Sequence, residues 1–281
     1  MIDLHTHSIA SDGSMMPAAL ARHAKASGLS LFALTDHDTT AGLREAEEAS
    51  AACGIRFVRG IELSAKSDYE MHIVGLDIDP ATPSLQGALE RALVARRERS
   101  EETCFLLNRL GFPVTTEEAE ALAPDGIVGR AHYARLLVDR GYVPSVKEAF
   151  DRYLSRGRPA YSQKQALSPE ECISLIAEAG GISVLAHLHL TGLVGEELER
   201  TVRRLGECGL CAVEGYYSEY TPEMQKEYIA LADRLGLGIS GGTDFHGNNK
   251  PHIQIGRGRG NLSVPDSVWD ELQKHRKNRN Q

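Results

Sequence analysis

Aromatic residues and cysteines are scarce in this sequence. Aromatic side chains make up 6% of the 281 residues, and most of them are tyrosines. This scarcity disfavours a protein that holds single-stranded nucleic acid by stacking bases on aromatic rings. The five cysteines are odd in number and follow no regular spacing. They therefore argue against a disulfide-stabilised secreted domain and favour a reducing compartment.

Long apolar runs are also missing. Each apolar stretch is short and interrupted by charge, so no segment is predicted to span a membrane. The first residues lack both the basic start and the long apolar stretch of a secretory signal. We therefore expect a cytoplasmic protein that does not engage membranes, and nothing in the sequence points to an obligate protein partner.

Positive charge is in the minority, with 31 Lys and Arg against 39 Asp and Glu and a net charge of −8. Such a balance argues against a protein that coats long duplex nucleic acid. The charge is nevertheless uneven. Residues 130–164 hold eight basic and three acidic side chains, a local charge of +5, which leaves −13 for the rest of the chain. This compact basic patch favours a short phosphorylated ligand over a long duplex.

Short apolar segments and amphipathic segments alternate along the first and last thirds of the chain, a pattern typical of βαβ units with a parallel sheet. Residues 39–54, for example, are expected to form a helix capped by Thr39 or Thr40. About seven strands are predicted. This number favours an α/β fold of the distorted TIM-like (β/α)7 barrel type over an open doubly wound sheet.

The alternation stops between residues 85 and 165. Four helical segments follow one another there without a strand between them. A run of helices inside an alternating chain indicates an inserted subdomain. We therefore expect a barrel formed by residues 1–84 and 166–281, and a helical insertion formed by residues 85–165.

Histidines and carboxylates recur where the predicted strands end. His5 and His7 are one residue apart on a strand, so their side chains share a face. Alone, such a pair could be ordinary surface or a metal site. The full set of candidates is His5, His7, Asp12, His37, Glu62, His72, His187, Asp244 and His246.

In a (β/α) barrel the carboxyl ends of the strands meet on one face, where these side chains would converge. Six imidazoles and three carboxylates exceed what one ion can use, because an ion takes four to six ligands. The sequence therefore predicts two or three divalent ions, with a carboxylate bridging a pair. Such a cluster suits a dianionic substrate.

Several motifs together resemble those of a known family. The stretches "DLHTHSIASDG", "LTDHD", "GIELS", "HIVGL" and "GTDFHG" are similar to the signatures of the PHP (polymerase and histidinol phosphatase) family of metal-dependent phosphoesterases. Within it, "GRAHYARLLVDRGYV" and "AFDRYLSRGRPAYS" resemble the branch that includes nucleoside 3′,5′-bisphosphate phosphatases and a related 5′–3′ exoribonuclease. The resemblance covers nearly the whole chain.

The resemblance implies a distorted (β/α)7 barrel with up to three metals, often manganese but also iron, zinc or magnesium. One ion would be held by His5, His7, Glu62 and Asp244. Glu62 would bridge to a second ion held with His72 and His187, and Asp12, His37 and His246 would take a third. Family members often have "AHP" where this chain has "AHL" followed by His189, so His189 is an alternative ligand to His187.

The resemblance also implies that the insertion supplies substrate-binding residues. These are Arg130, His132, Arg135, Arg158 and Lys164. Arginine forks suit phosphate, and His132 could donate a proton to the leaving group while Arg130 and Arg158 balance charge in the reaction. For Lys164, a solvated surface charge is an equally good interpretation.

Three functions remain open at this point. The first, which we prefer, is a phosphatase that attacks a nucleoside 3′,5′-bisphosphate with a metal-bound hydroxide, one phosphate on the metals and the other on arginines. The second is a 5′–3′ exonuclease on short RNA or DNA. The third is a metal-binding regulatory module without turnover, which the complete ligand set argues against.

Overall fold

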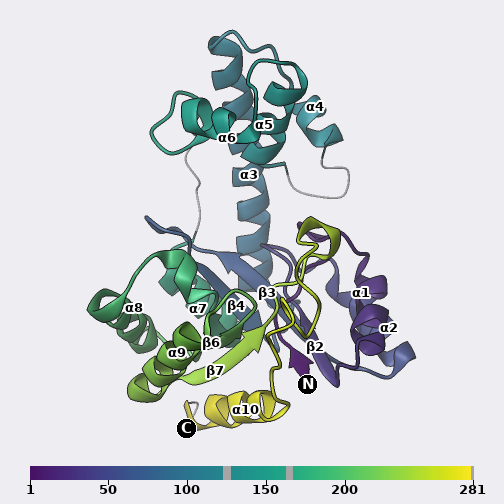
Figure 1. The fold of residues 1–281 in the computed structure, drawn as a ribbon, viewed down its shortest axis with the longest axis vertical. Helices are drawn as coiled ribbons and strands as arrows, with labels where there is room; N and C mark the ends of the chain where they lie inside the picture. Colours follow the sequence, from purple (N-terminus) through teal and green to yellow (C-terminus); the bar gives the residue numbers. More distant parts are fainter. Residues whose placement is uncertain (123–127, 163–166, 280–281) are drawn as a thin grey trace. The chain divides into compact units, whose positions relative to one another are not determined.

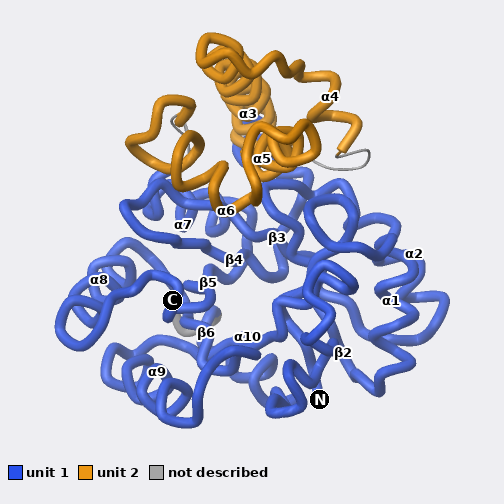
Figure 2. The backbone as a smooth tube through the Cα atoms, turned by 45° about the horizontal axis from the view of Figure 1, so that its top comes forward, with its two compact units in different colours: residues 1–87, 167–281 blue, residues 88–166 orange. Residues whose placement is uncertain are grey.

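A computed structural model of the protein describes residues 1–122, 128–162 and 167–279. The chain divides into two compact units (Figure 2). Unit 1 comprises Met1–Gly87 and Leu167–Gln281, and unit 2 comprises Ala88–Ala166. Unit 2 covers nearly the stretch expected to be an insertion. No helix in the described part of the chain is both long and apolar enough to cross a membrane.

Unit 1 is built on a sheet whose strands pair in chain order (Figure 1). The seven strands are β1 (Ile2–Asp3), β2 (Leu31–Leu34), β3 (Arg56–Ser64), β4 (His72–Leu76), β5 (Ile182–Leu185), β6 (Ala212–Tyr217) and β7 (Gly238–Gly242). The predicted number of strands is therefore confirmed. Helices are interposed between most of them, as expected for an α/β fold.

The sheet nearly closes into a barrel, because the chain after β1 runs alongside the end of β7 and the residues that follow it. The amide of Leu4 donates to the carbonyl of Gly241 at 3.1 Å, and the amide of Asp244 donates to the carbonyl of His5 at 2.9 Å. A side chain at Gly242 would lie 2.4 Å from the Cβ of His5, so this close approach requires glycine. The predicted TIM-like barrel of seven strands is confirmed.

The expectation of a parallel sheet is wrong at one strand, because β4 pairs antiparallel with both β3 and β5. The connection between β3 and β4 is only residues 65–71, too short for the crossover that parallel neighbours need. The reversal has a useful consequence. His72 is the first residue of β4, so it lies at the rim where β3 and β5 end.

Helices surround the barrel of unit 1. They are α1 (Pro17–Ala26), α2 (Leu43–Cys53), α7 (Pro169–Glu178), α8 (Gly195–Glu207), α9 (Pro222–Leu235) and α10 (Ser267–Arg279), with the short 3₁₀ turns η2 (Leu188–Thr191) and η3 (Gly247–Asn249). α10 packs through Val268, Trp269 and Leu272 against apolar side chains from the strands.

The expected cap of α2 is wrong. The helix begins at Leu43 with Gly42 as its N-cap, and no side chain caps it. Thr39 instead accepts a hydrogen bond from the amide of Ala41, at 3.2 Å. Threonine side chains form such local turns in competition with helix capping.

Unit 2 is helical and has its own core. Its elements are α3 (Pro83–Arg109), which begins in unit 1, α4 (Thr116–Ala121), α5 (Arg130–Asp139), α6 (Val146–Ala149) and the π-helical turn η1 (Phe150–Leu154). Leu107, Tyr133, Leu137 and Leu154 are buried together at its centre. A separate core of this kind is what defines a compact unit.

Candidate metal centre

Five histidine rings surround the carboxylate of Glu62. This residue is fully buried near the carboxyl end of β3. The rings are those of His5, His7, His37, His72 and His187. Oε1 of Glu62 lies 3.0 Å from a nitrogen of both His72 and His187. Oε2 lies 3.1 to 3.2 Å from nitrogens of the other three rings. One carboxylate therefore faces two groups of imidazoles, as the predicted bridging role requires.

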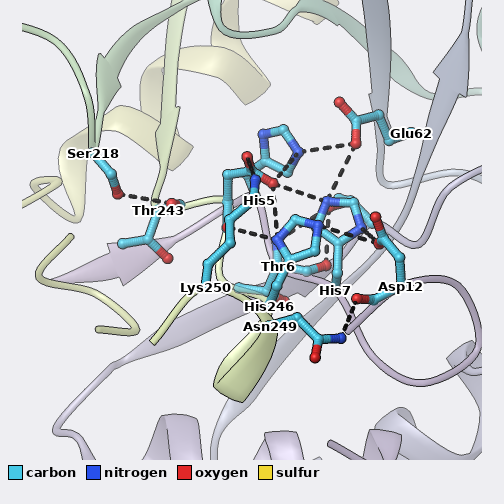
Figure 3. A network of polar contacts seen from close by, with 12 residues as sticks. His5, Thr6, His7, Asp12, Glu62, Ser218, Thr243, His246, Asn249 and Lys250 are labelled. Carbon is cyan, nitrogen blue, oxygen red and sulfur yellow. Dashed lines mark hydrogen bonds and ion pairs between the residues drawn. The ribbon is translucent and has the colours of Figure 1, made fainter. Parts of the chain in front are cut away.

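Two further carboxylates and a sixth histidine complete the cluster. Figure 3 shows two of these three, Asp12 and His246, beside His7. Oδ1 of Asp244 lies 3.2 Å from Nε2 of His7 and 3.7 Å from Nε2 of His5. His246 lies between the carboxylates, with Nε2 3.2 Å from Oδ1 of Asp12. Asp12 is the most exposed member, with 54% of its side chain accessible. The cluster thus opens to solvent on the Asp12 side.

All nine candidate ligands come together in the structure, in groups whose ligand atoms lie within 4.8 Å of one another. The groups are His7, Asp12, His37 and His246; His5, His7 and Asp244; His5, Glu62 and His187; and His37, Glu62 and His72. The resemblance had divided the residues differently, with Glu62 in two sets. In the structure the groups share His5, His7, His37 and Glu62. Metal binding by these residues stays a prediction.

Several buried ligand atoms of the cluster lack hydrogen bonds. Among the described residues these are Nε2 of His5, Nε2 of His7, Nδ1 of His37 and Oε2 of Glu62, which face one another, and Nδ1 of His187, whose other ring nitrogen contacts Glu62. Unsatisfied buried polar atoms are rare and cost free energy, so a group of them needs an explanation. Imidazole nitrogen and carboxylate oxygen are donors that divalent ions prefer, so these residues fit a metal site.

Two of the candidate ligands have strained backbones. His187 has a φ of 27° and Asp244 a φ of 55°, values that residues other than glycine rarely adopt. Hydrogen bonds hold both: the amide of His187 donates to Oε2 of Glu214 at 2.7 Å, and that of Asp244 to the carbonyl of His5. Strain that the surroundings maintain is typical of functional sites.

The turn between His7 and Asp12 is fixed by a buried carboxylate, Asp36, from the segment that follows β2. Asp36 accepts hydrogen bonds from the amide of Ser8 at 2.8 Å, from the Ser8 hydroxyl at 2.6 Å and from the Ser11 hydroxyl at 2.7 Å. Asp36 directly precedes His37. One residue therefore ties together the segments that supply three of the candidate ligands.

Residues 3–158 match the model of the PHP domain. The chain belongs to the PHP domain family. It is 34% identical to a 3′,5′-nucleoside bisphosphate phosphatase from Chromobacterium violaceum over 274 residues, 97% of this chain and 96% of the relative. It is also 34% identical to the 5′–3′ exoribonuclease Rnm from Escherichia coli over 270 residues, 95% of this chain and 92% of the relative.

A solved structure is similar to this PHP protein over nearly its full length. It is a protein from Bifidobacterium adolescentis assigned as a metal-dependent phosphoesterase. The two chains are 28% identical and superpose with a TM-score of 0.80, and the match covers 98% of this chain and 96% of the other. The family resemblance inferred from the motifs is therefore confirmed.

Sequence reasoning missed two buried carboxylates of this PHP site. Oε1 of Glu214 lies 3.1 Å from Nδ1 of His5, which leaves Nε2 of that ring pointing into the cluster. Asp3 accepts hydrogen bonds from the amide and hydroxyl of Thr243 and from the amide of Gly256. The sequence contained a signal for each. Asp3, His5 and His7 are spaced two residues apart, which predicts that they share a face, and Glu214 is a charged residue inside an apolar strand.

His189 is not part of the cluster. Its Nε2 lies 3.8 Å from Oε2 of Glu219, and its ring packs against Tyr217 and Tyr220. His187, in contrast, lies 3.0 Å from Glu62. Between the two alternatives, the geometry favours His187 as the ligand.

The charges of the cluster shift the pKa values of its members strongly. Burial disfavours the charged form of His7, but the close contacts of its ring with the carboxylates of Asp244 and Glu62 outweigh it and raise its pKa to about 10. Burial likewise opposes protonation of His5, yet Glu62 and Glu214 raise its pKa well above the usual value. His37 behaves oppositely: burial and the neighbouring His7 and His72 lower its pKa to about 3.

We expect metal binding to release protons. Without ions the facing carboxylates keep His5 and His7 protonated at neutral pH, and an ion can only bind the deprotonated ring. Metal affinity should therefore rise as pH increases toward 10, and fall as pH decreases. Calorimetric titration with Mn²⁺ in two buffers of different ionisation enthalpy checks this. Binding heats that do not depend on the buffer would contradict it.

In unit 2, His132 and Arg130 lie in the first turn of α5. Nδ1 of His132 accepts a hydrogen bond from the amide of Gly129 at 2.9 Å, so in the neutral ring the proton is on Nε2. Burial lowers the pKa of His132, which favours that neutral form. Arg130 donates to the carbonyl of Leu154 at 2.9 Å, and its guanidinium lies over the ring of Tyr161.

The other predicted substrate-binding residues differ in their surroundings. Arg135 is exposed and donates to Asp139, four residues along the same helix, at 2.8 Å. Arg158 is exposed, and its amide donates to the carbonyl of Ser155 at 2.9 Å. Lys164 lies outside the described residues. A role of these side chains in substrate binding stays a prediction.

Proposed function

We propose that this PHP protein is a metal-dependent phosphoesterase that releases inorganic phosphate from nucleoside 3′,5′-bisphosphates in the cytoplasm. One observation carries the proposal. The buried Glu62 carboxylate is surrounded by five imidazoles, and its Oε2 and the three imidazole nitrogens that face Oε2 make no hydrogen bonds. No neutral packing role explains that arrangement, whereas divalent ions would satisfy it.

We infer two or three ions, and manganese as the most suitable. Nine ligands in four overlapping groups exceed the needs of one ion. All the donors are imidazole nitrogens and carboxylate oxygens, which suit manganese, iron and zinc. Such ions, when bound, supply an activated water at neutral pH and positive charge for the phosphoryl oxygens.

The residues of the chain have distinct parts in this reaction. Glu62 lies 3.0 to 3.2 Å from the nitrogens of both groups of imidazoles and would hold the two groups together. Glu214 fixes the ring of His5 so that Nε2 faces the cluster. His132, with its proton on Nε2, is suited to donate to the leaving oxygen. Arg130 and Arg158 would bind a second phosphate by charge-assisted hydrogen bonds.

A bisphosphate as substrate is supported by charge and by similarity. The basic patch at residues 130–164 is compact, and the rest of the chain is acidic, which favours a short anionic ligand. The relative from C. violaceum that is similar over nearly the whole chain is named a 3′,5′-nucleoside bisphosphate phosphatase.

The test is a phosphate-release screen of the manganese-loaded protein against nucleoside 5′-monophosphates, 3′,5′-bisphosphates and short RNA and DNA oligonucleotides. We expect the highest kcat/KM with a bisphosphate and none after chelation. An absence of phosphate release from every substrate, with metal bound, would overturn the proposal.

A second activity is 5′–3′ exonuclease action on short RNA. It is favoured by the similarity to the exoribonuclease Rnm from E. coli. The screen separates the two: an exonuclease shortens a 3′-labelled oligonucleotide stepwise as it liberates mononucleotides. A silent regulatory module is disfavoured because the set of nine candidate ligands is complete.

Arg158→Ala should raise KM for a bisphosphate more than for a monophosphate. If Arg158 holds the phosphate remote from the metals, its binding energy is equal in ground and transition states. Loss of one charged hydrogen bond corresponds to roughly 1.5 to 3 kcal/mol. Steady-state kinetics on both substrates measure this, with Arg91→Ala, an exposed arginine of the same unit, as the control. Equal losses on both substrates would assign Arg158 to the reacting phosphate.

A further inference from the structure

Lys250 brings a positive charge into direct contact with the cluster of candidate metal ligands (Figure 3). Its Nζ lies 2.6 Å from Oδ2 of Asp244, and 39% of its side chain is accessible. The ammonium has three N–H groups. One of them donates to Oδ2 of Asp244, and the side chain is partly open to solvent, so two N–H groups are left for another acceptor.

The two oxygens of Asp244 have different neighbours. Oδ1 lies 3.2 Å from Nε2 of His7 and 3.4 Å from Nδ1 of His246. Oδ2 accepts hydrogen bonds from the hydroxyl of Tyr217 at 2.9 Å and from Lys250. Oδ1 is therefore the oxygen that faces the candidate ligands, and Lys250 does not occupy it.

The segment that carries Lys250 is tied to the turn that carries Asp12. Nδ2 of Asn249 donates to the carbonyl of Asp12 at 2.8 Å, and the amide of Asn248 donates to the hydroxyl of Ser14 at 2.7 Å. The amide of Ser14 in turn donates to the carbonyl of His246 at 3.1 Å. These bonds hold the backbone next to Lys250 at the open side of the cluster, where Asp12 is exposed.

We propose that Lys250 binds a non-bridging oxygen of the phosphate that reacts at the cluster, with Asp244 holding its ammonium in place. This inference rests on the proposed function, since it assigns a residue to the reacting phosphate. A lysine ammonium is a compact point charge suited to phosphate. A cation at this position offsets charge on the phosphoryl oxygens in addition to the ions.

The experiment measures inorganic phosphate binding by the manganese-loaded protein with calorimetry, together with Mn²⁺ affinity. Three variants are compared with the wild type: Lys250→Met, Tyr217→Phe and Lys226→Met. Tyr217→Phe removes the other hydrogen bond to Oδ2 of Asp244 and keeps the cation. Lys226→Met removes the same charge from an exposed position on α9 of the same unit.

Lys250→Met should weaken phosphate binding by roughly 10- to 100-fold, the loss of one charge-assisted hydrogen bond, without lowering Mn²⁺ affinity. Tyr217→Phe and Lys226→Met should bind phosphate as the wild type does. Lys250→Arg, which keeps the charge and serves if the Met variant folds poorly, should retain most of the affinity.

Two results would overturn the inference. Unchanged phosphate affinity in Lys250→Met, with tighter Mn²⁺ binding, would make Lys250 only a competing cation for Asp244. Parallel losses in Lys250→Met and Tyr217→Phe would make it a residue that acts through Asp244. Phosphate binding is measurable even if no nucleotide is hydrolysed, so failure of the substrate screen overturns the proposed function without obscuring this result.

Discussion

Replacing Glu62 with glutamine should lower kcat/KM for a nucleoside 3′,5′-bisphosphate by at least ~10³-fold, because the ions supply several kcal/mol of transition-state stabilisation. Glu62 belongs to two of the four candidate groups and faces five histidines. Glutamine keeps the shape and removes the charge. We therefore expect bound metal to fall together with activity.

The fold should survive this substitution. The surrounding imidazoles can release protons when the carboxylate is removed, so no charge is left buried without a partner. Metal content by elemental analysis, phosphate release and thermal unfolding measure the three properties. Glu227→Gln, at an exposed position on α9, is the matched control. A Glu62→Gln protein with full metal occupancy would refute the bridging role.

Glu214→Gln should weaken metal binding by roughly 10- to 100-fold, the usual cost of losing a partner behind a ligand. Glu214 contacts Nδ1 of His5 and the amide of His187. If the glutamine oxygen still accepts from His187, its NH₂ group faces Nδ1 of His5. The proton of that neutral ring must then move to Nε2, the atom that points into the cluster.

The measurement for this variant is Mn²⁺ affinity by competition with a chelator, alongside thermal unfolding. Glu219→Gln is the control, since Glu219 contacts Arg259 and His189 and belongs to no candidate metal group in the described chain. Wild-type Mn²⁺ affinity in Glu214→Gln would show that the orientation of His5 does not depend on this carboxylate.

The positions of most candidate ligands could be predicted from the sequence for two reasons: the alternation of side chains along a strand, and the alternation of strands and helices that indicates a barrel. Strand alternation predicts that His5 and His7 share a face, and both rings do contact Glu62, although β1 itself ends at Asp3. His37, Glu62 and His187 lie at or directly after the ends of strands, and a barrel brings such ends to one rim. These inferences need no knowledge of packing, only the direction of each strand and its place in the order.

The same reasoning could not predict how the strand with His72 runs. Alternation suggested parallel strands throughout, whereas β4 is antiparallel, and this reversal is what brings its first residue to the rim. The seven-residue connection before it, residues 65–71, contained the information, since parallel neighbours need a longer crossover.

Residue spacing could not predict the residues that act on the candidate ligands through side-chain contacts. Glu214 and Lys250 are matched to His5 and Asp244 by pairings that join distant parts of the chain. No periodicity relates their positions. In the same way, the hydrogen bond that sets the tautomer of His132 depends on the local geometry at the start of α5.

The central claim is that the cluster around Glu62 binds divalent ions and that these ions carry phosphoester hydrolysis. The most direct measurement is a titration of the metal-free protein with Mn²⁺, in which bound metal and the rate of phosphate release from a nucleoside 3′,5′-bisphosphate are followed in the same samples. We predict a rate that rises with occupancy, reaches its limit at two or three ions per chain and is abolished by a chelator. Phosphate release at full rate from the metal-free protein, or full occupancy with no release from any nucleotide, would contradict the account.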